Sequence, residues 1–459
     1  MIALPHLPID RSTPPSGGPI RPFHLPKVEV GSLESGLRLC SMLRDQVPLA
    51  NVCLVLDAGE AKVPLGGGGV AVLTGDALQG GTEHRSGAEL AEELEGLGSG
   101  LRVSTAWDAT TVSFTCVAER VDEVLSLLSE VVRFPAFPVE EVERVRQQRL
   151  SSIQQRRMDP GNLADDELAR LVFDAVHPYH RPVAGDEQSV TSLDRGDMMT
   201  LASKRYAPVG AGLVVVGNLS SDQSTELARR HFGSWDSPGV ADVEVPAPSQ
   251  WPSRSITIVH RPGAVQSELR IGHPGLARGH PDEIPLRVSN VVLGGAFTSR
   301  LNLSLREKHG FTYGARSWLA FRRDGGAFSI GTAVQTEVTA PALSEAIAVF
   351  EAFSDAGPSH EELVRARDYL AGIFPLRMET TAQLAARLAE LIIYDLAEDY
   401  HHIYRDRVRA VDVGSARAAV QQHLRPERST VVVVGDADRI GPELDALGLG
   451  PVQVAEPWT

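Results

Sequence analysis

The sequence predicts an α+β fold made of two homologous domains, each an antiparallel-rich sheet with helices packed on one face, joined by a linker. The first observation is length, because 459 residues exceed what one ordinary hydrophobic core accommodates. The second is that strand-like and helix-like periodicities alternate within the first half. The third is that two kinds of segment recur, in the same order, about 220 residues later in the chain.

Helix and strand signals follow one another early in the chain. Ser86 and Glu89 have the spacing of a capping box, and leucines at helical spacing follow them, so a helix is predicted there. Residues Thr110–Val117 alternate apolar and polar side chains, which predicts a half-buried strand. Residues Arg120–Phe134 return to a helical period. The polar face of the strand favours an antiparallel sheet with helices on its other face.

The two recurring segments predict a duplication. The apolar run in Gly212–Gln223, near the end of the first half, matches the run in Ser429–Ile440 near the end of the second. An arginine-rich helix beginning near Glu143 likewise matches one beginning near Leu363. Two matches in the same order at nearly one offset indicate two copies of one domain.

Residues 236–255 separate the two halves. They contain four prolines and few large apolar side chains, which predicts an extended linker. This boundary gives an N-terminal domain over residues 27–235 and a C-terminal domain over residues 256–459. Residues 1–26 contain seven prolines and form a separate segment. That segment has no basic start and no continuous apolar core, so we expect no secretory signal and a cytoplasmic location.

Composition excludes several classes of protein. The formal charge of −15 argues against binding to nucleic acid or to an anionic membrane surface. The 42% apolar and 22% charged residues are typical of a globular protein, and no apolar run is long enough to span a bilayer. Cys40, Cys53 and Cys116 are far apart in the sequence and form no C-x-x-C pair, so we expect buried free thiols.

The glycine-rich stretch Gly66–Ser86 is not a nucleotide-binding loop. A phosphate-binding loop of the Walker type would continue into Gly-Lys-Ser/Thr, and no lysine follows here. A dinucleotide fingerprint requires a strand before the loop, and the preceding residues are poor strand formers. The function of this stretch has to be inferred from the rest of the chain.

The most informative segment of the second half is Gly294–Ser317. A helix that ends between Arg306 and Tyr313 would turn the chain back and let both side chains face one cleft. An arginine fork beside a phenol can hold a peptide carbonyl and a developing oxyanion. The alternative is a surface arginine and a tyrosine at the edge of the core. Gly294 and Gly295 are candidate substrate-binding residues, or else residues of a tight turn.

This segment resembles the pitrilysin family of inverted zinc peptidases. Ser299–Tyr313 reads S-R-L-x-x-x-L-R-E-K-x-G-x-x-Y, a stretch characteristic of that family. His177–Val190 is similar to the family's H-P-x-G-R-P-x-x-G segment, with His180 in place of the glycine. Arg205–Asn218 resembles the strand before the family's domain boundary. Because these matches occur in the family's order, the resemblance covers nearly the whole chain.

The resemblance gives the glycine-rich stretch a meaning. Catalytic members read G-x-A-H-x-x-E-H there, with two zinc-binding histidines and a glutamate that activates water. In this chain Val72 stands in place of the first histidine, Gly75 in place of the glutamate and Asp76 in place of the second histidine. The third ligand, a glutamate on a later helix, aligns with Arg170. The resemblance therefore implies that these four positions are degenerate and bind no metal.

One other cluster is a candidate metal site. Glu398, Asp399, His401 and His402 lie together in the sequence. Adjacent histidines on a helix point about 100° apart, so a solvated helix face is the favoured interpretation.

The resemblance also implies a function. In the family, an arginine and a tyrosine seven residues later help to bind substrate and stabilise the tetrahedral intermediate, and Arg306 and Tyr313 match that pair. We therefore expect a non-catalytic subunit of a heterodimeric zinc metallopeptidase that cleaves extended peptides, similar to the alpha subunit of the mitochondrial processing peptidase. No cofactor is expected in this chain, and zinc is expected in a homologous partner subunit.

Two other functions stay open at this point. One is a catalytically inert scaffold or assembly protein of the same fold, like the core subunits of the cytochrome bc1 complex. The other is a self-sufficient peptidase with unrecognised ligands, which would require stoichiometric zinc in the purified chain. Retention of Arg306 and Tyr313 favours the peptidase subunit, because a scaffold has no use for that pair.

Overall fold

The computed structural model describes residues 12, 18, 21–236, 245–248 and 253–456. The predicted proline-rich segment 1–26 and the predicted linker 236–255 lie largely outside these residues. Among the described residues, none of the helices combines the length and apolarity that crossing a membrane requires.

The first half builds a six-stranded sheet in the order β1-β2-β6-β3-β5-β4. Strands β2 and β6 are parallel, and the other neighbouring pairs are antiparallel. The strands are β1 (Glu29–Ser32), β2 (Arg38–Leu43), β3 (Leu49–Leu56), β4 (Arg102–Thr105), β5 (Thr110–Val117) and β6 (Gly212–Gly217).

The second half builds a six-stranded sheet in the order β12-β7-β11-β8-β10-β9. Strand β7 runs parallel to both β11 and β12, and the other pairs are antiparallel. The strands are β7 (Ser255–His260), β8 (Gln266–Gly275), β9 (Ala315–Arg322), β10 (Gly325–Gln335), β11 (Thr430–Gly435) and β12 (Val452–Ala455).

Five strands correspond between the two sheets in order and direction, β2-β6-β3-β5-β4 with β7-β11-β8-β10-β9. The sixth strand differs, because β1 precedes the first core strand whereas β12 follows the last helix of its half. The predicted duplication and the two-domain α+β class are therefore confirmed. The two recurring apolar runs are β6 and β11, which occupy the same place in their sheets.

Fifteen α-helices lie among the described residues. Those of the first half are α1 (Val70–Ala77), α2 (Gly87–Gly96), α3 (Val121–Arg133), α4 (Val139–Met158), α5 (Pro160–Val172), α6 (Glu187–Ser192), α7 (Arg195–Arg205) and α8 (Ser221–Phe232). Those of the second half are α9 (Glu283–Asn290), α10 (Thr339–Ala356), α11 (His360–Ile373), α12 (Thr381–Ile393), α13 (Tyr400–Ala410), α14 (Val413–His423) and α15 (Ala437–Ala446).

The local sequence signals act as expected. The Ser86 side chain accepts from the Glu89 amide and the Glu89 carboxylate accepts from the Ser86 amide, so the predicted capping box begins α2. The predicted strand is β5, and its Val112, Phe114 and Cys116 side chains are buried. The three cysteines are free and buried, as expected.

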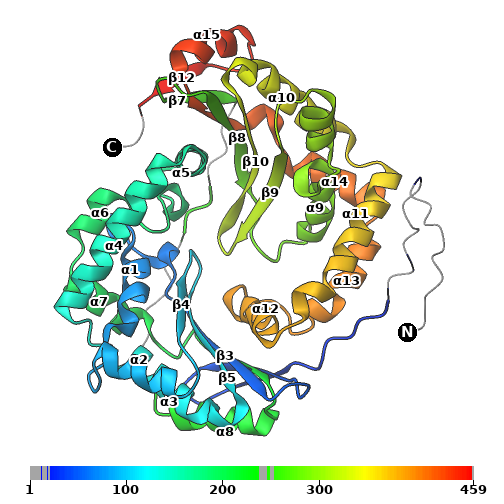
Figure 1. Cartoon of the computed structure of the whole chain (residues 1–459). Helices are drawn as coiled ribbons and strands as arrows, with labels where there is room; N and C mark the ends of the chain where they lie inside the picture. Colours follow the sequence, from blue (N-terminus) through cyan, green and yellow to red (C-terminus); the bar gives the residue numbers. More distant parts are fainter. Residues whose placement is uncertain (1–11, 13–17, 19–20, 237–244, 249–252, 457–459) are drawn as a thin grey trace, which may run out of the picture.

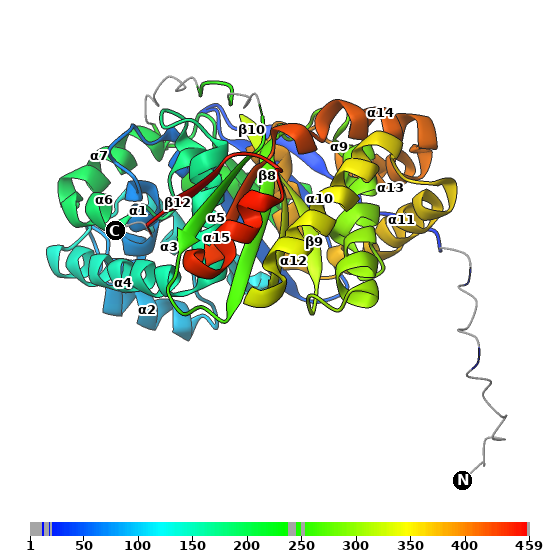
Figure 2. The ribbon, with the colours of Figure 1, turned by 90° about the horizontal axis from the view of Figure 1, so that it is seen from above.

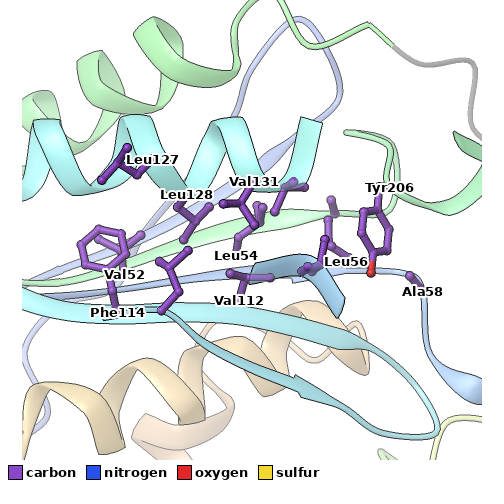
Figure 3. Close-up of a cluster of buried hydrophobic side chains, with 14 of the residues drawn as sticks. Val52, Leu54, Leu56, Ala58, Val112, Phe114, Leu127, Leu128, Val131 and Tyr206 are labelled. Atoms are coloured by element: carbon purple, nitrogen blue, oxygen red, sulfur yellow. The ribbon is translucent and has the colours of Figure 1, made fainter. Parts of the chain in front are cut away.

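One face of each sheet packs on the helices of its own half. In the first half, β3 and β5 contribute Leu54, Val112 and Phe114 to a core that α3 closes with Leu128 and Val131 (Figure 3). In the second half, Figure 2 shows α9, α10, α11, α13 and α14 gathered on one side of the sheet, with α5 on the other.

The opposite faces are covered by an exchange of helices between the halves. Helix α12 of the second half lies against β3 and β6, and α5 of the first half lies against β8 and β11 (Figure 1). In each sheet, a glycine leaves space for the helix that comes from the other half. A Cβ on Gly212 would come within 2.5 Å of Ile392, and a Cβ on Gly272 within 2.9 Å of Leu168. Each half therefore completes the core of the other, which the sequence did not predict.

Candidate functional site

Helix α1 carries the positions where the resemblance places the zinc motif. It begins after Gly69, whose φ of 88° is in the left-handed region and whose Cβ would lie 2.6 Å from the Ala184 carbonyl oxygen. The fully buried Glu60 carboxylate accepts from the backbone N–H of Gly69 at 2.7 Å and of Ala71 at 3.2 Å. A buried carboxylate thus occupies the positive end of the helix, where N–H groups need acceptors.

Arg181 is a cationic neighbour of the Glu60 carboxylate. The Arg181 guanidinium lies 3.4 Å from it and also donates to the Glu60 carbonyl. Burial raises the pKa of Glu60 to about 7, against the opposing effects of Arg181 and of the two amides. Arg181 belongs to the segment His177–Val190, which is similar to H-P-x-G-R-P. This segment thus holds the beginning of α1 in place through Arg181.

The three motif positions on α1 are closed by neighbouring side chains. Val72 is buried, and the Asp76 carboxylate forms a salt bridge with Arg149 of α4. A Cβ on Gly75 would lie 2.5 Å from the Thr105 hydroxyl oxygen of β4, so the backbone of α1 packs directly on that strand. A longer side chain at position 75 has no room unless Thr105 moves.

The structure corrects the expected position of the third degenerate ligand. Arg170 lies on α5, where it pairs with the buried Glu167. The helix that faces Asp76 is α4, because Arg149 and Ser152 line one pocket with Gly75 and Asp76. The expectation from the sequence was wrong here because α4 and α5 are consecutive helices, and only packing distinguishes which of them lies beside α1.

Arg306 and Tyr313 lie on either side of the end of a π-helical turn, η6 (Asn302–Lys308). The Arg306 guanidinium lies 3.8 Å from the centre of the Phe297 ring and donates to Glu307 at 2.8 Å. The Tyr313 side chain is 99% exposed. Arg306 therefore contacts Phe297 and Glu307, whereas the Tyr313 side chain is exposed to solvent.

Gly294 and Gly295 belong to a second π-helical turn, η5 (Val291–Gly295). A Cβ on Gly294 would lie 2.4 Å from the Ser317 amide nitrogen, so the residue is a glycine because β9 passes directly against it. Gly295 is exposed, and its Cβ would lie 3.0 Å from the Asn290 carbonyl oxygen. Close packing accounts for Gly294, and of the two only Gly295 faces solvent.

A cavity of about 790 Å³ lies between the two halves. The first half supplies residues of α4 and α5 and the segment after α5, and the second half supplies β9 and β10. The four predicted site residues Arg306, Tyr313, Gly294 and Gly295 are not among the described residues that line it. This cavity and the Arg306 surface are therefore separate features of the molecule.

The two adjacent histidines of α13 have different partners. The His401 ring contacts the Arg387 carbonyl at 2.8 Å, and the His402 ring contacts the Pro26 carbonyl at 3.1 Å. Each therefore has a structural contact of its own.

Sequence reasoning missed another group, formed by His280, Asp282 and His423, each of which offers one ligand atom within 4.8 Å of the others. The His423 ring already contacts the Asp282 carboxylate at 2.7 Å, which ties the end of α14 to the beginning of α9. No local motif indicates this group, because most of the second half separates Asp282 from His423 in the chain.

Comparison with known proteins agrees with this geometry. A protein-family model described as insulinase, peptidase family M16, matches residues 41–186 of the sequence. A second family model, described as the peptidase M16 inactive domain, matches residues 192–370. Together they cover well over half of the chain.

The chain belongs to peptidase family M16. It is 28% identical to an uncharacterized zinc protease of Mycobacterium tuberculosis over 411 residues, 88% of this chain and 92% of the relative. It is 25% identical to cytochrome b-c1 complex subunit 1 of Bos taurus over 279 residues, 59% of this chain and 56% of that protein.

Solved structures of two bacterial proteins have the same fold. A peptidase M16 inactive domain from Pseudomonas fluorescens superposes with a TM-score of 0.84 at 25% identity, covering 89% of this M16 chain and 98% of that one. A protease from Helicobacter pylori shares the fold with a TM-score of 0.83 at 20% identity, covering 90% and 100%. The findings together support a non-catalytic protein of the M16 fold.

Proposed function

We propose that this chain is the non-catalytic subunit of a heterodimeric M16 zinc metallopeptidase, and that it acts on extended peptides together with a homologous zinc-bearing subunit. The observation that carries the proposal is the exposure of Tyr313, which is 99% exposed and follows Arg306 by seven residues. The corresponding zinc-motif positions of this chain, Val72 and Gly75, have no metal-binding side-chain atom. In this proposal the chain supplies Arg306 and Tyr313 as the substrate-binding pair, and the partner supplies the zinc motif.

The surface around Arg306 supports a partner. The side chains of Phe297 and Leu303 are 70% and 52% exposed, and Phe297 stacks under the Arg306 guanidinium. An exposed apolar patch beside charged residues is typical of a protein contact surface. A homologous subunit that covers this patch would bring its own α1 region toward Arg306 and Tyr313.

In the assembled pair, the two residues would act on the substrate carbonyl. A zinc ion bound by the partner would supply the activated water. The Arg306 guanidinium and the Tyr313 hydroxyl would donate hydrogen bonds to the carbonyl oxygen as it gains negative charge, which is the usual electrostatic assistance to acyl transfer. Arg306 must leave Glu307 to do so, and its pairing with Glu307 is half-exposed and therefore weak.

An extended peptide would reach the site by pairing with a sheet edge. Strand β4 ends the first sheet and lies beside Gly75, so its outer backbone groups are the better candidates for strand addition. Strand β9 ends the second sheet, but Asn290 already donates to the Ser317 carbonyl and η5 packs against that strand. The glycine at 294 therefore serves packing rather than substrate in this proposal.

A scaffold role is the second candidate. Its support is the likeness to cytochrome b-c1 complex subunit 1, a protein named as a component of a larger complex. A scaffold would not depend on the hydroxyl of Tyr313 or on the guanidinium of Arg306, and this difference separates the two candidates.

The test is the Tyr313→Phe substitution in the assembled pair. We expect kcat on a peptide substrate to fall by about 100-fold, since removal of one oxyanion-stabilising donor typically costs that much. Tyr369→Phe is the matched control, because Tyr369 is also an exposed tyrosine and lies on α11. An unchanged kcat for Tyr313→Phe would remove the residue from the mechanism and favour the scaffold.

A further inference from the structure

One strand of the second half forms a wall of the cavity between the halves. Residues Arg316, Trp318, Ala320 and Arg322 of β9 all line it. Alternate residues of a strand share one face, so these four side chains point the same way. Two arginines therefore face the cavity from one strand, separated by six residues and hence by about 20 Å of extended chain.

The surroundings of Arg322 are unusual for a cation. Its guanidinium lies 4.3 Å from the centre of the Tyr179 ring and 5.1 Å from that of Trp107, both from the first half. Its Nη1 atom is buried and has no hydrogen-bond partner among the described residues, and burial lowers the pKa of the Arg322 guanidinium. The nearby Asp108 carboxylate instead accepts from the Tyr179 hydroxyl at 3.2 Å. A desolvated cation without a paired anion is unfavourable.

The other arginines around the cavity are each paired with an acidic residue. The pairs are Arg149 with Asp76, Arg156 with Asp166, Arg157 with Glu187, and Arg181 with Glu60. Within the described part of the chain, neither Arg316 nor Arg322 forms a salt bridge. The contact of the Arg316 guanidinium there is a cation–π contact with the Trp318 ring. The chain as a whole carries a charge of −15, so two unpaired arginines in one cavity are unexpected.

The acidic residues that line the cavity do not neutralise these two arginines. Asp165 pairs with Arg270, and Glu167 pairs with Arg170. The Asp186 side chain caps α6. The remaining walls include the apolar side chains of Leu163, Leu168, Val172 and Trp318. The cavity thus combines an apolar surface with two arginines that form no salt bridge within the described part of the chain.

We propose that this cavity binds an extended acidic peptide segment, with one carboxylate on Arg316 and a second, about six residues away, on Arg322. Arginine binds carboxylates through parallel N–H donors, and the length of β9 sets the spacing. The apolar walls accommodate uncharged side chains between the two acids. The site belongs to this chain alone, so it goes beyond the proposed function and does not require the zinc-bearing subunit.

The test uses the purified full-length chain and fluorescence anisotropy of labelled, C-terminally amidated decapeptides. One peptide has acidic residues at positions 2 and 8, one has them at positions 2 and 4, and one has none. We expect the first to bind most tightly and to weaken with salt, since the contacts are ionic. A fourth peptide, with one acidic residue and a free C-terminal carboxylate, tells whether the second anion is a side chain or a chain end.

The variants are Arg316→Gln, Arg322→Gln and Arg322→Lys, with Arg229→Gln as the control because Arg229 is exposed and pairs with Glu226 on α8. Each Arg→Gln change in the cavity should weaken binding of the first peptide about tenfold or more, and Arg229→Gln should not. Arg316 is exposed, so its replacement leaves the fold intact even if changes at Arg322 do not.

Two results would overturn the proposal. The first is equal affinity for the acidic and the uncharged peptides, which would mean that the arginines recognise no anion. The second is an unchanged affinity in both Arg316→Gln and Arg322→Gln, which would place the peptide elsewhere. Because the assay contains no partner subunit, either result leaves the heterodimer proposal standing, and a failed heterodimer leaves this site untouched.

Discussion

Arg149 on α4 forms a salt bridge with Asp76 on α1, at the position where the M16 zinc motif would have its second histidine. The only carboxylate that α1 offers for a metal is therefore already paired with a cation of the same chain. Both residues are partly exposed, so the ion pair adds little to stability.

The contact between α1 and β4 predicts the effect of a single methyl group. Gly75→Ala should lower the free energy of unfolding by about 1–3 kcal/mol, since its Cβ would meet the Thr105 hydroxyl oxygen at 2.5 Å. Gly96→Ala is the control, because Gly96 ends α2 and a Cβ there would have nothing within 4 Å. Urea unfolding measures both. A neutral Gly75→Ala would show that α1 has room for longer side chains at this position.

The side chains of α1 also predict the zinc content of the purified chain. We expect the chain, equilibrated with zinc and desalted, to retain far less than one zinc per molecule by elemental analysis. Should near-stoichiometric zinc remain, its loss on Asp76→Ala would mean that the α1 region still binds metal. Its loss on His423→Ala would instead locate the ion at the group of His280, Asp282 and His423. Either outcome would contradict the expectation that zinc belongs to the partner.

Buried Glu60 predicts a pH dependence of stability. Its pKa is raised from 4.5 to about 7 in the folded chain, so the folded state binds the proton more tightly than the unfolded state. The contribution of Glu60 is therefore fully present below pH 4.5 and is lost as the pH rises to about 7, by about 1.4 kcal/mol per pH unit at most. Subtracting the Glu60→Gln curve from the wild-type curve isolates this contribution.

A suitable control for that measurement is Glu95→Gln, which changes an exposed residue of α2. Its stability curve should run parallel to the wild-type curve between pH 4.5 and 7. If Glu60→Gln also runs parallel, the carboxylate is ionised throughout, held so by Arg181 and the amides of Gly69 and Ala71.

The exchange of helices between the halves predicts a strong effect at α12. Leu388 is 2% exposed and belongs to the cluster that α12 forms with the first sheet. Leu388→Ala should therefore destabilise the chain by about 2–5 kcal/mol. Leu376→Ala, at a side chain that is 64% exposed, should change stability by no more than about 0.5 kcal/mol. Equal effects of the two changes in urea unfolding would show that α12 does not complete the core of the first half.

Much of the fold was predictable from local patterns. The capping box at Ser86, the alternation in β5 and the recurrence of β6 as β11 are each encoded within short stretches of sequence. The covering of one face of each sheet by a helix of the other half was not predictable, because α5 and α12 look like other amphipathic helices. Their close packing also requires glycines at 212 and 272, which lie in the opposite half of the chain.

The candidate site was predictable only where the motif is contiguous. Val72, Gly75 and Asp76 lie close together in the sequence and on one helix, α1. Arg149, which pairs with Asp76, and Arg322, which faces the cavity, lie far from that motif in the sequence, and no spacing rule links them to it. The wrong assignment of Arg170 has the same origin, because the packing of α4 on α1 is a tertiary contact.

The most direct test of the heterodimer is to tag this chain in its native cell and to identify and count the proteins that copurify with it. We expect one homologous chain bearing His-x-x-Glu-His in a one-to-one ratio, and peptidase activity that requires both chains and falls on Tyr313→Phe. Recovery of the chain alone, or within a large assembly without such a homologue, would contradict the heterodimer and favour the scaffold.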